Sequence, residues 1–248
     1  MIINSYLKDG LWQYESMEFI ILIQEFRHRD GYNCGCEVFF HPRYIEPEIF
    51  YSTVSRDFLI SLTKMQINVC REISKSTGLR LFFNIEPDAI CECYDDIMKT
   101  TNAECDIIFE VTERTCSNSN ETLQAIKSLH ENGVVFCVDD FSINYEGVAT
   151  KSLIDDCFEF VKLVAPKDFT NSKLWNDLFH LIKLAKAWNK LVIVENVATR
   201  FMHRLLENKS NADAFQGYYI HRPQIISNYR QHLILPKQLM HLQMHASH

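Results

Sequence analysis

Two adjacent carboxylates, Asp139 and Asp140, stand directly after the apolar run Val134–Val138. Neighbouring like charges raise each other's pKa unless a cation or several hydrogen-bond donors lie between them. A divalent metal ion would supply that cation. On these two residues alone an alternative stays open, in which the aspartates cap the next turn or helix, a position that Asp favours.

The same pattern, an apolar run that ends in a polar side chain, recurs along the chain. Such runs end at Asn84, Glu110, Lys162 and Glu195. In a β/α barrel the carboxyl ends of the strands meet on one face, where catalytic groups lie. The pattern therefore predicts a single site built from one polar residue per strand end. Glu37 lies inside a further apolar run, where a carboxylate needs a partner.

Strand-like runs and helical spacing alternate over most of the chain, and 248 residues suit one β/α barrel. We predict an α/β fold of the TIM-like (β/α)8 type. Strands are expected over residues 19–26, 35–40, 81–85, 106–111, 134–138, 158–163, 191–195 and 212–218, the first two forming a hairpin. Helices are expected over residues 47–74, after Pro87, from 117–121 to 132–133, over 174–188, and over 228–244 with a break at Pro236.

The ends of the chain carry weaker patterns. We expect residues 1–16 to be an N-terminal extension, residues 17–230 to form the barrel domain, and residues 231–248 to be a tail or helix. The late histidines, at positions 232, 241, 245 and 248, are too irregularly spaced for a metal site. No linker or internal repeat divides the chain, so one domain is predicted.

The formal net charge of -7 argues against direct binding to nucleic acid or to an anionic membrane. A protein surface or a small ligand held through metal fits this charge better. No apolar run approaches the ~20 residues that span a bilayer. The start of the chain lacks the basic residues and cleavage site of a signal peptide, and we therefore expect a cytoplasmic protein.

Nine cysteines are scattered over predicted strands and helices. Their odd number and their distribution favour reduced thiols that pack as small apolar side chains. The pairs Cys34/Cys36 and Cys91/Cys93 lack further ligands at zinc-site spacing, so a zinc site is not expected.

In order, the motifs resemble those of the EAL-domain family, bacterial proteins whose active members hydrolyse cyclic di-GMP to linear pGpG. The resemblance covers residues 17–230 and implies a barrel whose first strand is antiparallel to its neighbour. The motifs are Glu37-Val38-Phe39, Asn84, Glu110-Val111-Thr112-Glu113, Asp139-Asp140-Phe141, Phe160-Val161-Lys162, Val194-Glu195-Asn196-Val197 and Gln216-Gly217-Tyr218 with Arg222-Pro223.

The resemblance also implies roles for the polar residues. By it, Asp140 helps to hold a second Mg²⁺ or Mn²⁺, Lys162 lies near the attacking water, Glu195 binds or activates that water, and Gln216 supports it. The first metal ion would be held by Glu37, Asn84, Glu110 and Asp139. Oxygen ligands of these types suit hard divalent cations.

Six positions depart from the family pattern. His41 replaces an arginine that grips the ligand phosphate, and a neutral imidazole cannot form a bidentate guanidinium clamp. Val164 and Ala198 replace carboxylates. Phe39 replaces the leucine of the family name, and Ser142 and Asn144 replace glycines in the loop after Asp140.

These departures leave more than one function open. Our first hypothesis is a regulator with lost or weakened cyclic di-GMP hydrolysis that binds a protein, the FlhD subunit of the flagellar master regulator FlhDC, and represses motility. That hypothesis follows from a resemblance to short EAL-like proteins with eroded motifs. The alternative is an active Mg²⁺- or Mn²⁺-dependent phosphodiesterase, and a receptor that binds cyclic di-GMP without cleaving it is also open. The surviving acids could also be inherited, with hydrogen bonds in place of metal.

Overall fold

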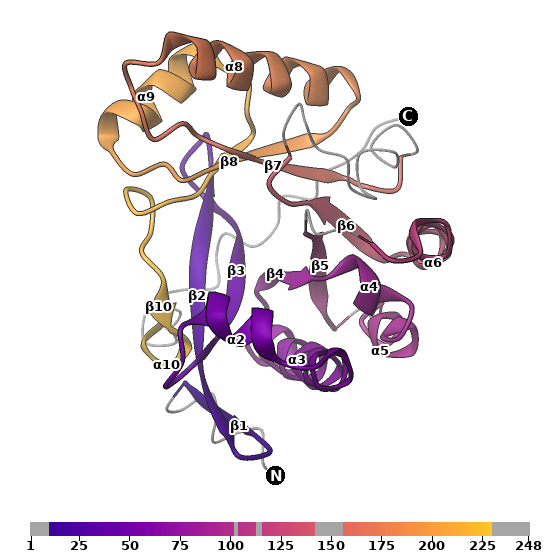
Figure 1. Ribbon diagram of the computed structural model, residues 1–248. Coiled ribbons are helices and arrows are strands. Elements are labelled where there is room, and N and C mark those ends of the chain that lie inside the picture. Colours follow the sequence, from indigo (N-terminus) through magenta and orange to yellow (C-terminus); the bar gives the residue numbers. More distant parts are fainter. Residues whose placement is uncertain (1–9, 102–103, 113–115, 142–155, 230–248) are drawn as a thin grey trace.

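The computed structural model describes residues 10–101, 104–112, 116–141 and 156–229, and its centre is a closed ring of eight strands (Figure 1). Neighbouring strands pair in chain order from β2 to β9, and β2 closes the ring on β9. β2 is antiparallel to β3 and to β9, whereas all other pairs within the ring are parallel. The ring strands are β2 (Met17–His28), β3 (Asn33–Pro42), β4 (Arg80–Ile85), β5 (Asp106–Val111), β6 (Val135–Val138), β7 (Phe160–Val164), β8 (Leu191–Glu195) and β9 (Ala214–Phe215).

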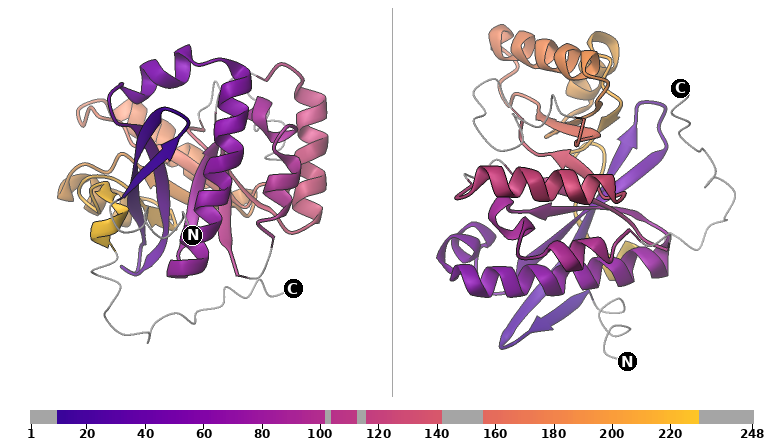
Figure 2. Two further views of the ribbon diagram at one scale, coloured as in Figure 1. Left: turned by 90° about the horizontal axis from the view of Figure 1, so that it is seen from below. Right: turned by 90° about the vertical axis from the view of Figure 1, so that its right-hand side faces the viewer.

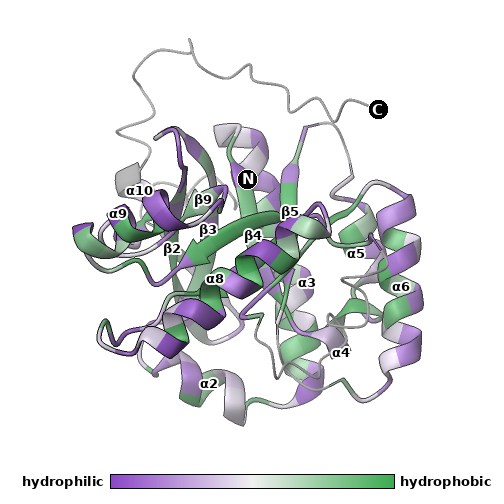
Figure 3. Cartoon of the chain, turned by 90° about the horizontal axis from the view of Figure 1, so that it is seen from above, coloured by the Kyte–Doolittle hydropathy of each residue, from purple (hydrophilic) through white to green (hydrophobic). Residues whose placement is uncertain are grey.

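The predicted TIM-like barrel with an antiparallel first strand is therefore confirmed. Helices surround the ring on the outside, as the two views of Figure 2 show. Figure 3 shows α3, α6 and α8 striped with hydrophobic and hydrophilic residues, as expected for helices that pack one face on strands. The helices are α2 (Pro47–Thr53), α3 (Arg56–Thr77), α4 (Pro87–Ile90), α5 (Tyr94–Met98), α6 (Ser119–Glu131), α8 (Ser172–Ala187), α9 (Arg200–Lys209) and α10 (Ile226–Tyr229).

None of these helices has the length and apolar character needed to cross a bilayer, a statement that covers only the described residues.

One predicted helix is wrong in its extent. Residues 47–74 form two helices, α2 and α3, because the backbone is extended at Val54 and Ser55. The Ser55 hydroxyl accepts a hydrogen bond from the Phe58 amide at 3.3 Å and caps the start of α3. A side chain that caps one of the free amides of a helix start stabilises a new helix rather than the continuation of the old one.

The one helix expected after Pro87 forms two, α4 and α5, and three further elements were not predicted. β1 (Leu11–Tyr14) lies in the expected N-terminal extension and pairs antiparallel with the start of β2. α9 follows β8, and β10 (Gln224–Ile225) pairs with the middle of β2. The expected helix over 228–244 and the late histidines lie almost entirely outside the described residues.

The inside of the barrel is built in layers. A small apolar cluster of Phe26, Phe82, Ile108, Cys137, Ile193 and Ala214 is fully or almost fully buried. On the parallel strands, each of these residues lies two positions before a polar residue, and alternate residues of a strand face the same side. The polar residues therefore form the next layer towards the carboxyl ends of the strands, above an apolar floor.

Candidate active site

The Lys162 side chain lies at the centre of the polar layer and is 1% exposed. Its ammonium nitrogen lies 3.2 Å from Glu37 Oε2, 3.3 Å from Glu110 Oε2, 3.0 Å from Asp139 Oδ1 and 3.2 Å from Glu195 Oε2. We call these four carboxylates and Lys162 the acidic cage. Four carboxylates around one buried ammonium leave an excess of negative charge that favours a further cation.

The electrostatics of the cage reflect this excess. Burial raises the pKa of the Glu110 carboxyl well above its ordinary value, and Glu37 raises it further. Burial opposes the charge of Lys162, but the surrounding carboxylates hold the pKa of its ammonium well above its ordinary value. The lysine therefore stays charged while Glu110 resists ionisation. A second positive charge nearby would lower the pKa of Glu110 and favour its ionised form.

Two amide side chains hold Glu37 in place. Asn84 Nδ2 donates to Glu37 Oε1 at 2.6 Å, and Gln216 Nε2 donates to Glu37 Oε2 at 2.7 Å. Asn84 comes from β4, and Gln216 follows β9 directly. Lys162 also contacts Glu37. The Glu37 carboxylate, which the sequence analysis expected to need a partner, therefore has three.

A further buried residue, Gln24 on β2, was missed from the sequence. Its Oε1 accepts a hydrogen bond from Gln216 Nε2 at 3.1 Å, and its Nε2 donates to the His221 carbonyl at 2.8 Å. Gln24 pairs with Glu37 in the β2–β3 register. A buried glutamine inside the apolar run 19–26 was the available signal, because such a side chain needs partners.

Asp139, Asp140 and Glu195 form a second group at the opening of the cage. Each offers a carboxylate oxygen, and these oxygens lie within 4.8 Å of one another. Burial raises the pKa of Asp139 to about 6, against the opposing effect of Lys162. Burial, with a hydrogen bond that the protonated Glu195 carboxyl donates to Asp140, raises the pKa of Glu195 to about 7. Carboxyls with raised pKa values in one cleft are typical of a functional site.

The donor set fits a divalent cation. Asn84 Oδ1, Glu110 Oε1 and Gln216 Oε1 are buried and accept no hydrogen bond from the described residues. Buried oxygens of this kind are rare in folded proteins, because each loses its hydration without compensation. Two of them belong to predicted metal ligands, Asn84 and Glu110, which are neighbours in the β4–β5 register. Hard oxygen donors and excess negative charge suit Mg²⁺, Mn²⁺ or Ca²⁺.

A cavity of about 460 Å³ opens above the cage. We call its outer wall the cavity rim, formed by Phe39, Val164, Lys167, Ala198 and Tyr218. Val164 is 45% exposed and Tyr218 is 65% exposed. The exposed Lys167 adds a positive charge to this rim, and the rim contains no carboxylate.

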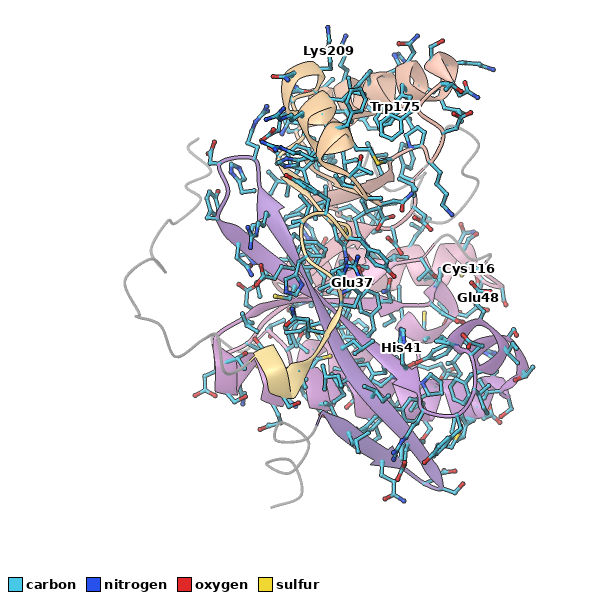
Figure 4. All side chains as sticks on the ribbon, turned by 90° about the vertical axis from the view of Figure 1, so that its left-hand side faces the viewer. Glu37, His41, Glu48, Cys116, Trp175 and Lys209 are labelled. Carbon is cyan, nitrogen blue, oxygen red and sulfur yellow. The ribbon has the colours of Figure 1, made fainter. Side chains whose placement is uncertain are left out.

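His41 lies two residues beyond Phe39 on β3, on the same face of the strand, and Figure 4 shows it apart from Glu37. Burial lowers the pKa of the His41 imidazole, so the ring is neutral near pH 7.

Backbone geometry places the strand-end residues. Asp140 and Asn196 adopt left-handed conformations, with φ values of 47° and 59°. Such conformations cost energy for residues other than glycine and concentrate at functional sites. Gly217 has φ 145°, and a Cβ there would lie 2.4 Å from the backbone of Val197. Only glycine lets the chain after Gln216 pass this close to the end of β8.

The structure brings together all the predicted ligand and catalytic residues, and it leaves the roles of those residues as predictions. Ser142 and Asn144 lie outside the described residues, as does Glu113. All nine cysteines are free thiols, and the described part of the chain contains no cysteine cluster able to hold a metal.

Comparison with known proteins agrees with the geometry. Residues 39–223 match the model of the EAL domain. The chain is 28% identical over 200 residues to a probable cyclic di-GMP phosphodiesterase, PdeG, of Escherichia coli K12, covering 74% of this chain and 39% of PdeG. The chain thus spans about two fifths of the length of that relative.

Two solved structures share the fold. The PaMucR phosphodiesterase in complex with c-di-GMP superposes with a TM-score of 0.73 at 15% identity, covering 85% of this chain and 99% of that one. The Bacillus subtilis YkuI protein, which has an EAL domain and is bound to c-di-GMP and calcium, superposes with a TM-score of 0.69 at 13% identity, covering 94% and 62%. With a family match over most of its length and the corresponding barrel, the chain belongs to the EAL-domain family.

Proposed function

We propose that this EAL-domain protein binds a divalent cation in the acidic cage, hydrolyses cyclic di-GMP weakly or not at all, and acts by binding a protein. The observation that carries the proposal is a cavity rim without carboxylates above an intact cage. Val164 and Ala198 line the cavity beside Glu195, at positions where the family resemblance implies carboxylates.

Loss of the arginine that the family resemblance implies at position 41 weakens the grip on a nucleotide. A cyclic dinucleotide presents two phosphodiesters, which need positioned cations or hydrogen-bond donors. His41, neutral and half-buried, supplies no bidentate clamp. Loss of a buried charged contact costs roughly 2 to 5 kcal/mol, which corresponds to tens to thousands of times weaker binding.

For the partner, we propose FlhD and a role in repressing motility. This part of the proposal is supported by the resemblance of the eroded motifs to those of short EAL-like regulators, and by the net charge of -7, which disfavours nucleic acid as a direct target. Gel filtration of the purified chain with FlhD tests it. We expect a co-eluting complex, and separate elution of the two proteins would remove FlhD from the proposal.

A second candidate, an active phosphodiesterase, is favoured by the completeness of the cage. Glu37, Asn84, Glu110 and Asp139 would hold the first cation, and Asp140 with Glu195 would face a second one. Bound Mg²⁺ or Mn²⁺ would activate water and neutralise charge at phosphorus. Glu195, with a pKa of about 7, could accept a proton from the attacking water, and Lys162 would hold the neighbouring carboxylates in position.

The experiment that separates the two candidates measures linear dinucleotide after incubation with cyclic di-GMP and Mn²⁺. We expect a rate at least about 100-fold below that of a phosphodiesterase with a complete motif set, because losses of supporting groups each cost 10 to 100-fold. The triple variant His41→Arg, Val164→Asp, Ala198→Glu restores the missing charges and should gain activity. A wild-type rate equal to that of the reference enzyme, abolished by Glu37→Ala, would establish the second candidate.

A further inference from the structure

α8 and α9 carry an excess of positive charge, in contrast to the net charge of -7 of the whole chain. Their lysines and arginines outnumber their acids, Asp177 and Glu207, although acids outnumber bases in the whole chain. The two helices lie side by side on one side of the barrel in Figures 1 and 2. The basic residues are Lys173, Lys183, Lys186, Arg200, Arg204 and Lys209.

A groove of about 420 Å³ runs between the two helices. Its wall on α8 consists of Asn176, Phe179, His180 and Lys183, which are spaced three and four residues apart and so form one stripe of the helix. On α9 the wall consists of Leu205 and Lys209, again four residues apart. A third helix can pack into the groove between two such rows of side chains.

The chemistry of the groove specifies its occupant. Phe179 and Leu205 are half-buried and give an apolar floor, whereas His180, Lys183 and Lys209 are exposed at the edges. Within the described residues, Lys183 and Lys209 have no carboxylate within ion-pair distance, in contrast to Lys186, which pairs with Asp213 at 2.8 Å. Cationic edges without partners beside an apolar floor complement an amphipathic helix with acidic flanks.

We propose that the α8–α9 groove docks an acidic amphipathic helix of a partner protein. The apolar side chains of that helix would contact Phe179 and Leu205, and its carboxylates would pair with Lys183 and Lys209. The inference deepens the protein-binding part of the proposed function and places the contact on the outside of the barrel, away from the cavity above the acidic cage. Binding there can persist whether or not cyclic di-GMP is hydrolysed.

The test uses the full chain and a fluorescent synthetic helix with leucines spaced three and four apart and glutamates on both flanks. We expect saturable binding, measured by fluorescence anisotropy, that weakens with added salt. The double variant Lys183→Glu, Lys209→Glu should bind at least about tenfold more weakly. Lys127→Glu, an exposed lysine on α6, is the control and should bind as the wild type does. A peptide with lysines in place of the glutamates should not bind.

Absence of saturable binding, or equal binding by the double variant and the wild type, would overturn the proposal. A dimer of the wild type in analytical ultracentrifugation that the double variant loses would identify a second copy of this chain as the occupant instead. Groove-dependent binding to vesicles of anionic lipid without binding of the acidic peptide would identify a membrane surface. None of these measurements uses cyclic di-GMP or FlhD. The docking proposal can therefore be overturned while the proposed function stands, and the proposed function can be overturned while the docking proposal stands.

Discussion

The acidic cage and the cavity rim lie a few residues apart on the same strand ends, yet they differ in chemistry. In the cage, every charged side chain has a partner, with Lys162 contacting four carboxylates. The rim exposes Val164, Ala198 and Tyr218 to the cavity and carries the single lysine Lys167, with no carboxylate beside it. Buried charges cannot be removed singly without a large loss of stability, whereas rim residues can change at little cost. A retained cage is therefore weaker evidence for catalysis than a retained rim would be.

Of the variants below, Lys162→Met should have the largest effect on stability. It leaves four carboxylates without their central cation and should lower the free energy of unfolding by about 3 to 5 kcal/mol at pH 7. Urea unfolding measures this change. Lys186→Met, which removes a partly exposed partner of Asp213, is the control and should cost at most about 1 kcal/mol. Equal losses of unfolding free energy in the two variants would show that the ion pairs of Lys162 do not stabilise the cage.

Glu110→Gln should weaken binding of Mn²⁺ more than about 100-fold, since it removes a buried ligand rather than a supporting partner. Calorimetric titration of the metal-free protein measures the affinity. Glu131→Gln, on an exposed position of α6, should bind as the wild type does. Unchanged binding in Glu110→Gln would place the cation outside the cage.

The stability of the metal-free protein should fall as the pH rises from about 4 to about 7. Glu195 and Asp139 have folded-state pKa values of about 7 and about 6, raised from ordinary values, so the native state binds more protons than the unfolded state in this range. At about 1.4 kcal/mol per pKa unit, the rise in the pKa of Glu195 from 4.5 to about 7 contributes about 3.5 kcal/mol at most to this loss of stability.

Thermal unfolding across this pH range tests that prediction. Glu195→Gln should flatten the slope, and an excess of Mn²⁺ should reverse it, because the deprotonated carboxylates bind metal. A metal-free protein that gains stability between pH 4 and 7, and equally so in Glu195→Gln, would contradict the raised pKa values.

Gln24→Leu should lower the affinity for Mn²⁺ about 10 to 100-fold, because it removes the support of Gln216 and through it of Glu37. Gln66→Leu, which changes an equally buried glutamine that donates to Tyr51, is the matched control. It should lower stability by a similar amount without affecting metal binding. Equal metal affinities in the two variants would make Gln24 a purely structural residue.

The sequence predicted the barrel and most of its strand ends, because polar residues that follow apolar runs are a strong local signal. The sequence was a poorer guide to features that depend on a particular contact in the folded chain. The break between α2 and α3 depends on the cap at Ser55, and β1 becomes a strand only by pairing with β2. Gln24 was missed because its hydrogen bonds connect residues almost two hundred positions apart.

The central position of Lys162 also emerged only from the structure. The sequence placed this lysine at a strand end, but the contacts with Glu37 and Glu110 require the ring to close. The departures at Val164 and Ala198 were visible in the sequence, and the structure adds that both residues line the cavity.

We propose that an intact acidic cage lies below a cavity that no longer grips a cyclic dinucleotide. The rate of linear dinucleotide formation by the wild type and by the triple variant His41→Arg, Val164→Asp, Ala198→Glu, both saturated with Mn²⁺, tests this proposal. We expect little or no product from the wild type and a gain of at least about tenfold in the variant, since one restored charged contact provides about 1.4 kcal/mol or more. A wild type that already cleaves cyclic di-GMP rapidly, with no gain in the variant, would contradict it.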